Sequence, residues 1–168
     1  MSTTETTDTS EDATPAGGHA QDAAYAIFER ATQRARQGNL PYAGAVTPAE
    51  AFRLQQLEEA VIVDVRTRAE WEFVGRVARA PLIEWRAWGA TEPNPDFVAE
   101  LGSRVPPQRT VLFLCRSGVR SHHAAAAATR AGYARAMNIL EGFEGDLGPD
   151  GRRGHAGWRC AGLPWNQG

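Results

Sequence analysis

The sequence lacks the features that mark membrane-spanning, secreted and nucleic-acid-binding proteins. None of its apolar runs approaches the roughly 20 residues that a helix needs to cross a bilayer. Residues 1–5 carry neither the basic nor the apolar segment of a secretory signal. The formal net charge is −2, which gives no electrostatic reason to bind nucleic acid or an anionic membrane. The two cysteines, Cys115 and Cys160, make no disulfide framework, so we expect a reduced, cytoplasmic setting.

What is present is the composition of an ordinary globular domain. The 168 residues are 42% apolar and 23% charged, enough for one domain with a real core. Residues 1–20 offer almost nothing to bury and are predicted to form a disordered leader. Residues 21–44 are predicted to form a helical extension and a linker, and residues 45–168 the domain itself. The helix follows from the spacing of its apolar residues, which are Ala24, Ile27, Phe28 and Ala31.

The domain alternates short apolar strands with helices. Thr47 and Glu50 form a predicted capping box with Pro48 at the first helical position, and Asn94 is the predicted N-cap of a later helix. This alternation predicts an α/β fold, a mostly parallel five-stranded sheet with helices on both faces. The five expected strands are residues 45–46, 61–66, 80–83, 111–114 and 134–140.

The most informative stretch follows the fourth of these strands, where residues 115–121 read Cys-Arg-Ser-Gly-Val-Arg-Ser and lead into a helix. A strand–loop–helix of this kind leaves backbone N–H groups pointing into the loop. These amides, the helix N-terminus, Arg116 and Arg120 would each favour the charged form of the Cys115 thiol. The alternative is an inert cysteine at the end of a core strand, which would need neither the glycine nor the two arginines. The pattern therefore favours a nucleophile.

This motif resembles the active-site loop of rhodanese-domain sulfurtransferases, Cys-x-x-Gly-x-Arg. Four residues separate Cys115 from Arg120, whereas the related cysteine phosphatases place five there to cradle a larger phosphoryl group. Two weaker matches are Asp64-x-Arg66 followed by Glu70, and the ending Ala-Gly-Leu-Pro at residues 161–164. The resemblance covers about residues 45–165, with no internal repeat, and departs from the family at residues 75–80.

The resemblance implies a thiosulfate sulfurtransferase that works through a Cys115 persulfide, with cyanide or a thiol, including a protein thiol, as the acceptor. It implies no cofactor and no metal, and adjacent histidines such as His122 and His123 point in different directions on a helix. A sulfur carrier or partner-binding module without enzymatic activity is the alternative. Asp64 and Arg66 are expected to support the site. The expected substrate-binding residues are Arg116, Ser117, Gly118, Val119, Arg120 and Ser121.

Five points remain open in the sequence. Arg120 can bind the anionic donor or brace the loop, and Asp64 can pair with either arginine, Arg66 or Arg120. Trp85 and Trp88 pack over the sheet edge, the favoured alternative, or form one wall of a pocket. Residues 144–156 cover the mouth of the site or form an ordinary surface loop. Cys160 relays sulfur from Cys115 or, as we favour, is unreactive.

Overall fold

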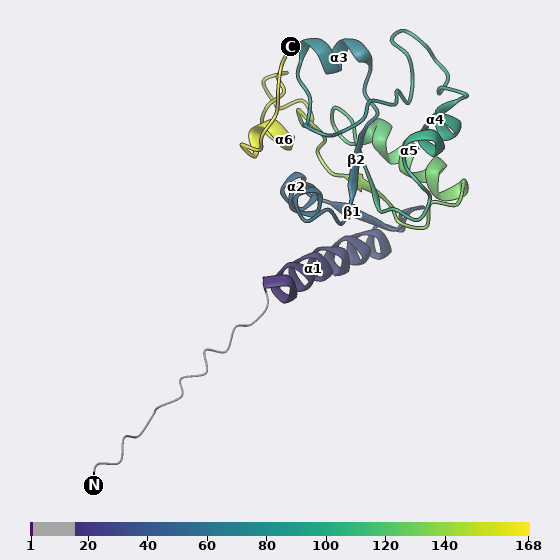
Figure 1. Ribbon diagram of the computed structural model, residues 1–168. Helices are drawn as coiled ribbons and strands as arrows, with labels where there is room; N and C mark the ends of the chain where they lie inside the picture. The colour runs from purple at the N-terminus through teal and green to yellow at the C-terminus, as the bar shows by residue number, and fades with distance from the viewer. Residues whose placement is uncertain (2–15) are drawn as a thin grey trace.

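The computed structural model describes Met1 and residues 16–168, so most of the expected leader, residues 2–15, lies outside the described residues (Figure 1). Residues 16–20, also expected in the leader, begin the first helix. In the described part of the chain, no helix is both long enough and apolar enough to cross a membrane. The elements in chain order are α1 (Ala16–Gln37), β1 (Gly44–Val46), α2 (Pro48–Gln56), β2 (Val61–Asp64), α3 (Arg68–Phe73), α4 (Phe97–Arg104), β3 (Val111–Leu114), α5 (Val119–Arg130), β4 (Ala136–Ile139) and α6 (Gly157–Cys160).

The sheet is parallel and has four strands in the order β1-β4-β3-β2. The prediction of a fifth strand at residues 80–83 was wrong. That segment runs beside β2 but makes only an isolated bridge between Leu82 and Asp64. The Pro81 carbonyl accepts from the Asp64 N–H at 3.0 Å, and the Ile83 N–H donates to the Asp64 carbonyl at 2.9 Å. Pro81 has no N–H of its own with which to extend the ladder toward the start of β2.

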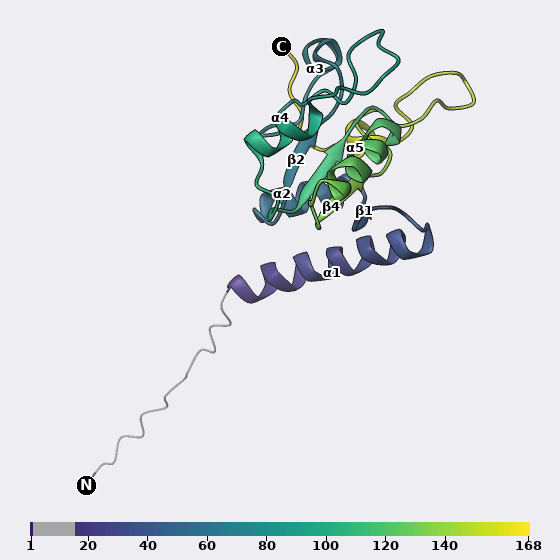
Figure 2. The same ribbon diagram turned by 90° about the vertical axis from the view of Figure 1, so that its right-hand side faces the viewer.

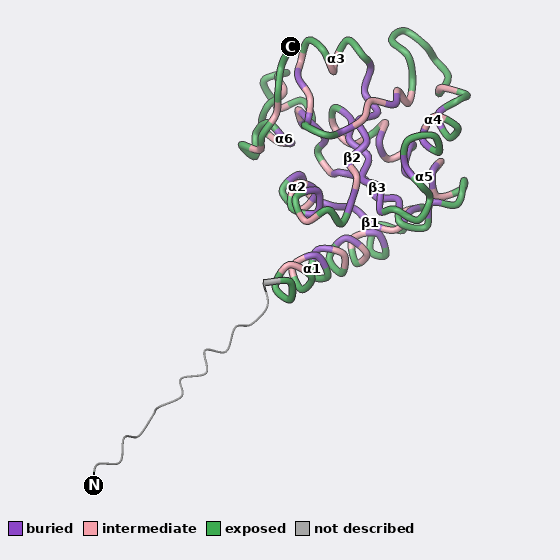
Figure 3. Tube along the Cα trace, in the orientation of Figure 1, coloured by how far each residue is buried: buried purple, intermediate pink, exposed green. Residues whose placement is uncertain are grey.

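Side chains alternate along the strands and build a core on each face of the sheet, as Figure 3 shows by its buried centre. On one face, Ile62, Leu112 and Met137 pack against α1, α2 and α6. On the other, Val63 and Phe113 pack against α4 and α5. The prediction of an α/β fold with helices on both faces is therefore confirmed.

Helix α1 packs along the β1 side of the molecule (Figure 2). Its buried face includes Ile27 and Ala31, and its exposed side carries arginines that reach α2. Arg34 donates to Glu50 at 2.7 Å, and Arg30 donates to the same carboxylate at 2.8 Å. The extension is thus attached to the rest of the molecule by both apolar packing and ion pairs.

Glu50 also belongs to the predicted capping box of α2, which is confirmed. The Thr47 hydroxyl accepts from the Glu50 N–H at 3.2 Å, and the Glu50 carboxylate accepts from the Thr47 N–H at 3.0 Å. Burial raises the pKa of Glu50, but hydrogen bonds from Arg34, Thr47 and Arg30 outweigh it and lower the pKa to about 2.

Helix α4 begins at Phe97 with Asp96 as its N-cap, so the prediction of Asn94 as N-cap was wrong. The side-chain oxygen of Asn94, Oδ1, accepts from the Asp96 N–H at 3.0 Å and closes a turn before the helix. Its amide group donates to the Glu84 carbonyl at 3.1 Å. The asparagine joins the loop before the helix to the helix start, in place of capping it.

Candidate functional site

Because the strands are parallel, their carboxyl ends meet at one edge of the sheet, and the loops that follow β3 and β4 are hydrogen-bonded there. The Phe143 N–H donates to the Cys115 carbonyl at 2.8 Å, and the Glu144 N–H donates to the Arg116 carbonyl at 2.9 Å. Gly142 makes this approach possible, since a Cβ there would lie 2.5 Å from the Cys115 carbonyl oxygen and its φ is +63°. The β4 loop thus holds the first two carbonyls of the cysteine loop.

Two donors point at the Cys115 sulfur. The Gly118 N–H lies 3.1 Å from Sγ, and the buried Ser121 hydroxyl donates to Sγ at 3.2 Å. Gly118 is the N-cap of α5 with φ of +99°, a conformation that a residue with a side chain rarely adopts. Both hydrogen bonds stabilise negative charge on the sulfur.

Cys115 is only 1% exposed. It lies below the loop because it directly follows the fully buried strand β3, and Gly118 and Ser121 donate to it from the start of α5.

Arg120 is fixed by an acidic partner from α3. Two guanidinium nitrogens of Arg120 donate to the two carboxylate oxygens of Glu70, each at 2.7 Å. Burial raises the pKa of Glu70, but hydrogen bonds from Arg120 and Thr67 and the charge of Arg120 lower it to about 2. Burial lowers the pKa of Arg120, and Glu70 more than reverses this effect. One edge of the guanidinium is therefore occupied, which favours the bracing role over donor binding.

Sequence reasoning missed Glu70 as the partner of Arg120, although a signal was present. Glu70 is the third residue of α3, and its carboxylate accepts from the Thr67 N–H at 3.0 Å, while the Thr67 hydroxyl accepts from the Glu70 N–H at 3.3 Å. This is a second capping box with the same Thr-x-x-Glu spacing as the first. That spacing marks a helix start, but it does not say which distant arginine the glutamate binds.

Asp64 pairs with Arg66, one of the two arginines considered for it. Both side chains are completely buried, and Arg66 Nη2 lies 2.6 Å from Asp64 Oδ2 and 2.7 Å from the Gly75 carbonyl. The guanidinium also lies 4.2 Å from the centre of the Phe143 ring. The paired charges join the end of β2 to the β4 loop, in keeping with a supporting role.

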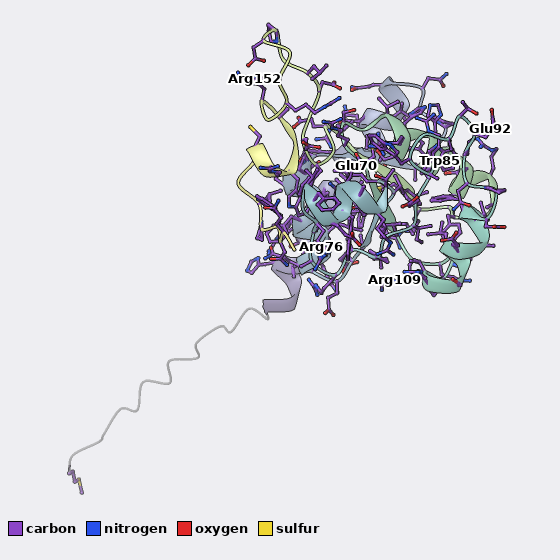
Figure 4. The ribbon with its side chains drawn as sticks, turned by 90° about the horizontal axis from the view of Figure 1, so that it is seen from above. Glu70, Arg76, Trp85, Glu92, Arg109 and Arg152 are labelled. Carbon is purple, nitrogen blue, oxygen red and sulfur yellow. The ribbon has the colours of Figure 1, made fainter. Side chains whose placement is uncertain are left out.

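Arg116 lies half exposed on the outer side of the loop, and its Nε donates to Glu144 at 3.0 Å. Ser117 is half-buried and Val119 is exposed. Glu144 is the first residue of the 144–156 loop, whose far part projects away from the body in Figure 2, with Arg152 at the periphery in Figure 4. The loop therefore contacts Arg116 through its first residue and does not fold over the cysteine loop.

A cavity of about 420 Å³ adjoins this site. Trp88 lies on its wall and is 82% exposed, whereas Trp85 packs edge-to-face on Phe97 with ring centroids 5.1 Å apart. Each of the two alternatives therefore applies to one tryptophan: Trp85 packs on the domain, and Trp88 lines a pocket. The cavity is lined by Thr67, Glu70, Arg86, Ala87, Trp88, Gly89, Ala90, Arg116 and Arg120.

The remaining candidates make no hydrogen bond to the sulfur among the described residues. The Tyr42 hydroxyl and His122 Nδ1 share a hydrogen bond of 2.8 Å, and burial followed by the charge of His123 lowers the pKa of His122. Cys160 is exposed on α6 and lines a separate cavity with Arg153 and Glu144. Within residues 16–168, no three His, Cys, Asp or Glu side chains are placed to hold a metal ion.

Comparison with known proteins agrees with this geometry. The family model described as "Rhodanese-like domain" matches residues 47–146. The crystal structure of Rv0390 from M. tuberculosis is 47% identical, with a TM-score of 0.67, over 76% of this chain and 99% of that one. The uncharacterized protein RC0915 of Rickettsia conorii is 34% identical over 64% of this chain and 84% of its own. A protein named "Sulfurtransferase" from Allochromatium vinosum is 31% identical over 54% of this chain and 75% of its own.

The family match covers β2, β3, α5 and β4 together with the cysteine loop, and the architecture built on them is shared with a solved structure along almost its whole length. Sulfurtransferases are among its more distant relatives. The chain therefore belongs to the rhodanese-like domain family.

Proposed function

We propose that this chain is a sulfurtransferase that moves a sulfane sulfur from a donor such as thiosulfate to cyanide or a thiol through a Cys115 persulfide. The observation that carries the proposal is the pair of donors, the Gly118 N–H at 3.1 Å and the Ser121 hydroxyl at 3.2 Å, directed at Sγ. Donors fixed in this way stabilise a thiolate before reaction and need no rearrangement during it. The thiolate needs a reducing environment, which supports a cytoplasmic location.

The reaction divides into two displacements. The Cys115 thiolate attacks the outer sulfur of thiosulfate, an S–S bond forms, and the S–S bond of the donor breaks with its electron pair leaving on sulfite. The enzyme now carries a persulfide anion. Cyanide or a thiolate then attacks the outer sulfur, takes it as thiocyanate or a new persulfide, and restores the Cys115 thiolate. Neither step changes the total charge or requires an oxidant.

The loop residues take different parts in this scheme. Backbone groups from Arg116 to Ser121, through Ser117, Gly118 and Val119, surround the outer sulfur, which stands about 2 Å beyond Sγ. Arg116 attracts the anionic donor from the half-exposed side of the loop. Arg120 keeps the start of α5 in place through its ion pair with Glu70. The Asp64–Arg66 pair supports the site by joining the end of β2 to the loop after β4. We assign this activity to residues 45–168, with residues 21–44 as an extension.

The two cysteines provide a matched test. Cys115→Ser should lower the thiosulfate:cyanide rate by at least about 10³-fold, because the nucleophile is gone. Cys160→Ser should keep the rate within about twofold of the wild-type protein, because the exposed thiol has no part in the scheme. Full activity in the Cys115 variant would refute the proposal, and loss of activity only in the Cys160 variant would move the nucleophile to α6.

A sulfur carrier is the second candidate, and the 1% exposure of Cys115 favours it, because a covered sulfur is protected from solvent thiols. The carrier would receive sulfur from a protein persulfide and pass it on without using free thiosulfate. Rates with thiosulfate and with a persulfidated protein as donors distinguish the two. Loading of Cys115 from the protein donor alone would establish the carrier.

A further inference from the structure

We propose that the cavity beside the cysteine loop admits a sulfur donor larger than thiosulfate, an organic persulfide that bears a carboxylate, and that Arg86 and Trp88 recognise it. The inference rests on the sulfur transfer proposed above and adds the class of donor. It assigns a role in specificity to the segment between Trp85 and Asn94, which lies outside the Cys-x-x-Gly-x-Arg motif.

The size of the cavity exceeds what thiosulfate needs. At about 30 Å³ per atom, the share of one water in the liquid, the five non-hydrogen atoms of thiosulfate fill about 150 Å³. The cavity holds about 420 Å³, which falls in the range of pockets that bind small organic molecules. Arg116 and Arg120 of the cysteine loop line it together with Glu70. An organic body can therefore occupy the cavity next to the cysteine loop.

The three arginines that line the cavity differ in whether they have an acidic partner. Arg120 is paired with Glu70, and Arg116 with Glu144. Arg86 is exposed on the same wall, and no acidic partner lies within ion-pair distance of it among residues 16–168. A guanidinium offers two parallel N–H donors that match a carboxylate. This group selects an anionic donor.

Trp88 supplies an apolar surface on the same wall. Its side chain is 82% exposed, which is unusual for so large an apolar group, whereas its neighbour Trp85 is packed on Phe97. A ligand that covers the indole removes its apolar surface from water, and this burial stabilises the complex. The carbon skeleton of the donor would lie here, beside the carboxylate bound to Arg86.

The segment that carries both side chains is held at its ends. The Trp85 N–H donates to the Val65 carbonyl at 3.1 Å, directly after β2, and the Asn94 N–H donates to the Trp85 carbonyl at 2.7 Å. A turn closes between them, with the Ala90 N–H donating to the Ala87 carbonyl at 3.1 Å. Figure 4 looks onto this edge of the molecule, with Glu70 near the centre and Trp85 beside it. The wall is thus connected to the same strand end that leads to Glu70.

The transfer from such a donor is balanced in the same way as that from thiosulfate. The Cys115 thiolate attacks the outer sulfur of R–S–SH, and a new S–S bond forms. The S–S bond of the donor breaks, and its electron pair leaves on the inner sulfur as the thiolate R–S⁻. The proton stays on the transferred sulfur, so no further reactant is needed.

Two donors that differ in one group test the inference, N-acetylcysteine persulfide and N-acetylcysteine amide persulfide. The wild-type protein should use the acid with a kcat/KM about tenfold above that of the neutral amide, because only the acid can pair with Arg86. Arg86→Gln should remove this preference, and Arg86→Lys should restore part of it. Trp88→Ala should lower kcat/KM for both organic donors about tenfold, since both cover the indole.

Arg152→Gln is the control, because it removes the same charge at the periphery of Figure 4 and should keep the preference for the acid. An equal preference for the two donors in the wild-type protein, or an Arg86→Gln variant that keeps the preference, would overturn the inference. If thiosulfate still loads Cys115 in that case, the proposed function stands. If no donor loads Cys115, the proposed function fails first.

Discussion

Two short segments of this molecule, residues 47–50 and 67–70, are built alike and serve different ends. Each reads Thr-x-x-Glu, follows a parallel strand and starts a helix with a reciprocal capping box. In each, the glutamate also accepts hydrogen bonds from an arginine elsewhere in the chain, and its pKa falls to about 2. The local chemistry of the two segments is therefore the same.

The difference lies in what each glutamate binds. Glu50 binds Arg30 and Arg34 of α1 and attaches the N-terminal extension to the sheet. Glu70 binds Arg120 at the first turn of α5, next to the cysteine loop. The same motif thus fastens a helix in one place and braces the candidate active site in the other. Position at the sheet edge, and not the motif, decides which role each glutamate has.

The largest expected contrast is in catalysis. Glu70→Gln should lower kcat/KM for thiosulfate about 100-fold, because Arg120 loses its charged partner and the start of α5 is no longer fixed around Sγ. Glu50→Gln should keep kcat/KM within about twofold, although it breaks an equivalent carboxylate–guanidinium contact. Both variants are compared by steady-state rates at equal concentrations of folded protein. Equal losses in the two variants would show that the two segments do not differ in role.

The next prediction concerns how the two glutamates contribute to the free energy of unfolding as the pH is lowered. Both glutamates have folded-state pKa values of about 2 against an ordinary 4.5, so each stabilises the fold above pH 4.5 and loses that contribution as the pH falls toward 2. At pH 7, Glu50→Gln and Glu70→Gln should each lower the free energy of unfolding by up to about 3 kcal/mol. Urea denaturation at a series of pH values should show both deficits shrinking below pH 4.5. A deficit that stays constant down to pH 2 would mean that neither carboxylate owes its effect to charge.

The smallest effect separates the two arginines on α1. Arg34 makes two hydrogen bonds to Glu50 and one to the Ala45 carbonyl, with its side chain 30% exposed. Arg30 makes one hydrogen bond to Glu50, and its side chain is 52% exposed. Arg34→Gln should lower the free energy of unfolding by about 1 kcal/mol, and Arg30→Gln by less than about 0.5 kcal/mol. Thermal unfolding of both variants measures this, and a larger effect at Arg30 would reverse the proposed order.

The parts of this structure that the sequence predicts are those with local causes. Four apolar residues before Cys115 indicate a buried strand, and Gly118 indicates the turn and the helix start after it. The capping box at Thr47 needs only neighbours along the chain. The α/β architecture follows from repeating such local signals, although the short segment around Leu82 was overestimated as a strand.

The parts that the sequence does not predict depend on distant residues. Glu70 and Arg120 are separated by 50 positions, so their pairing depends on how the fold brings the starts of α3 and α5 together. The burial of Cys115 depends on the loop folding back over it. The exposure of Trp88 depends on where the chain leaves the sheet edge. In each case the missing information is the three-dimensional position of a loop.

The most direct test of this account is the mass of the two cysteine-containing peptides after exposure to thiosulfate and removal of excess reagent. We expect the peptide with Cys115 to gain about 32 Da, the mass of one sulfur atom, and to lose it again on addition of cyanide. The peptide with Cys160 should keep its mass. An unchanged Cys115 peptide, or the added sulfur on Cys160, would contradict the claim that the sulfur beneath Gly118 and Ser121 is the nucleophile.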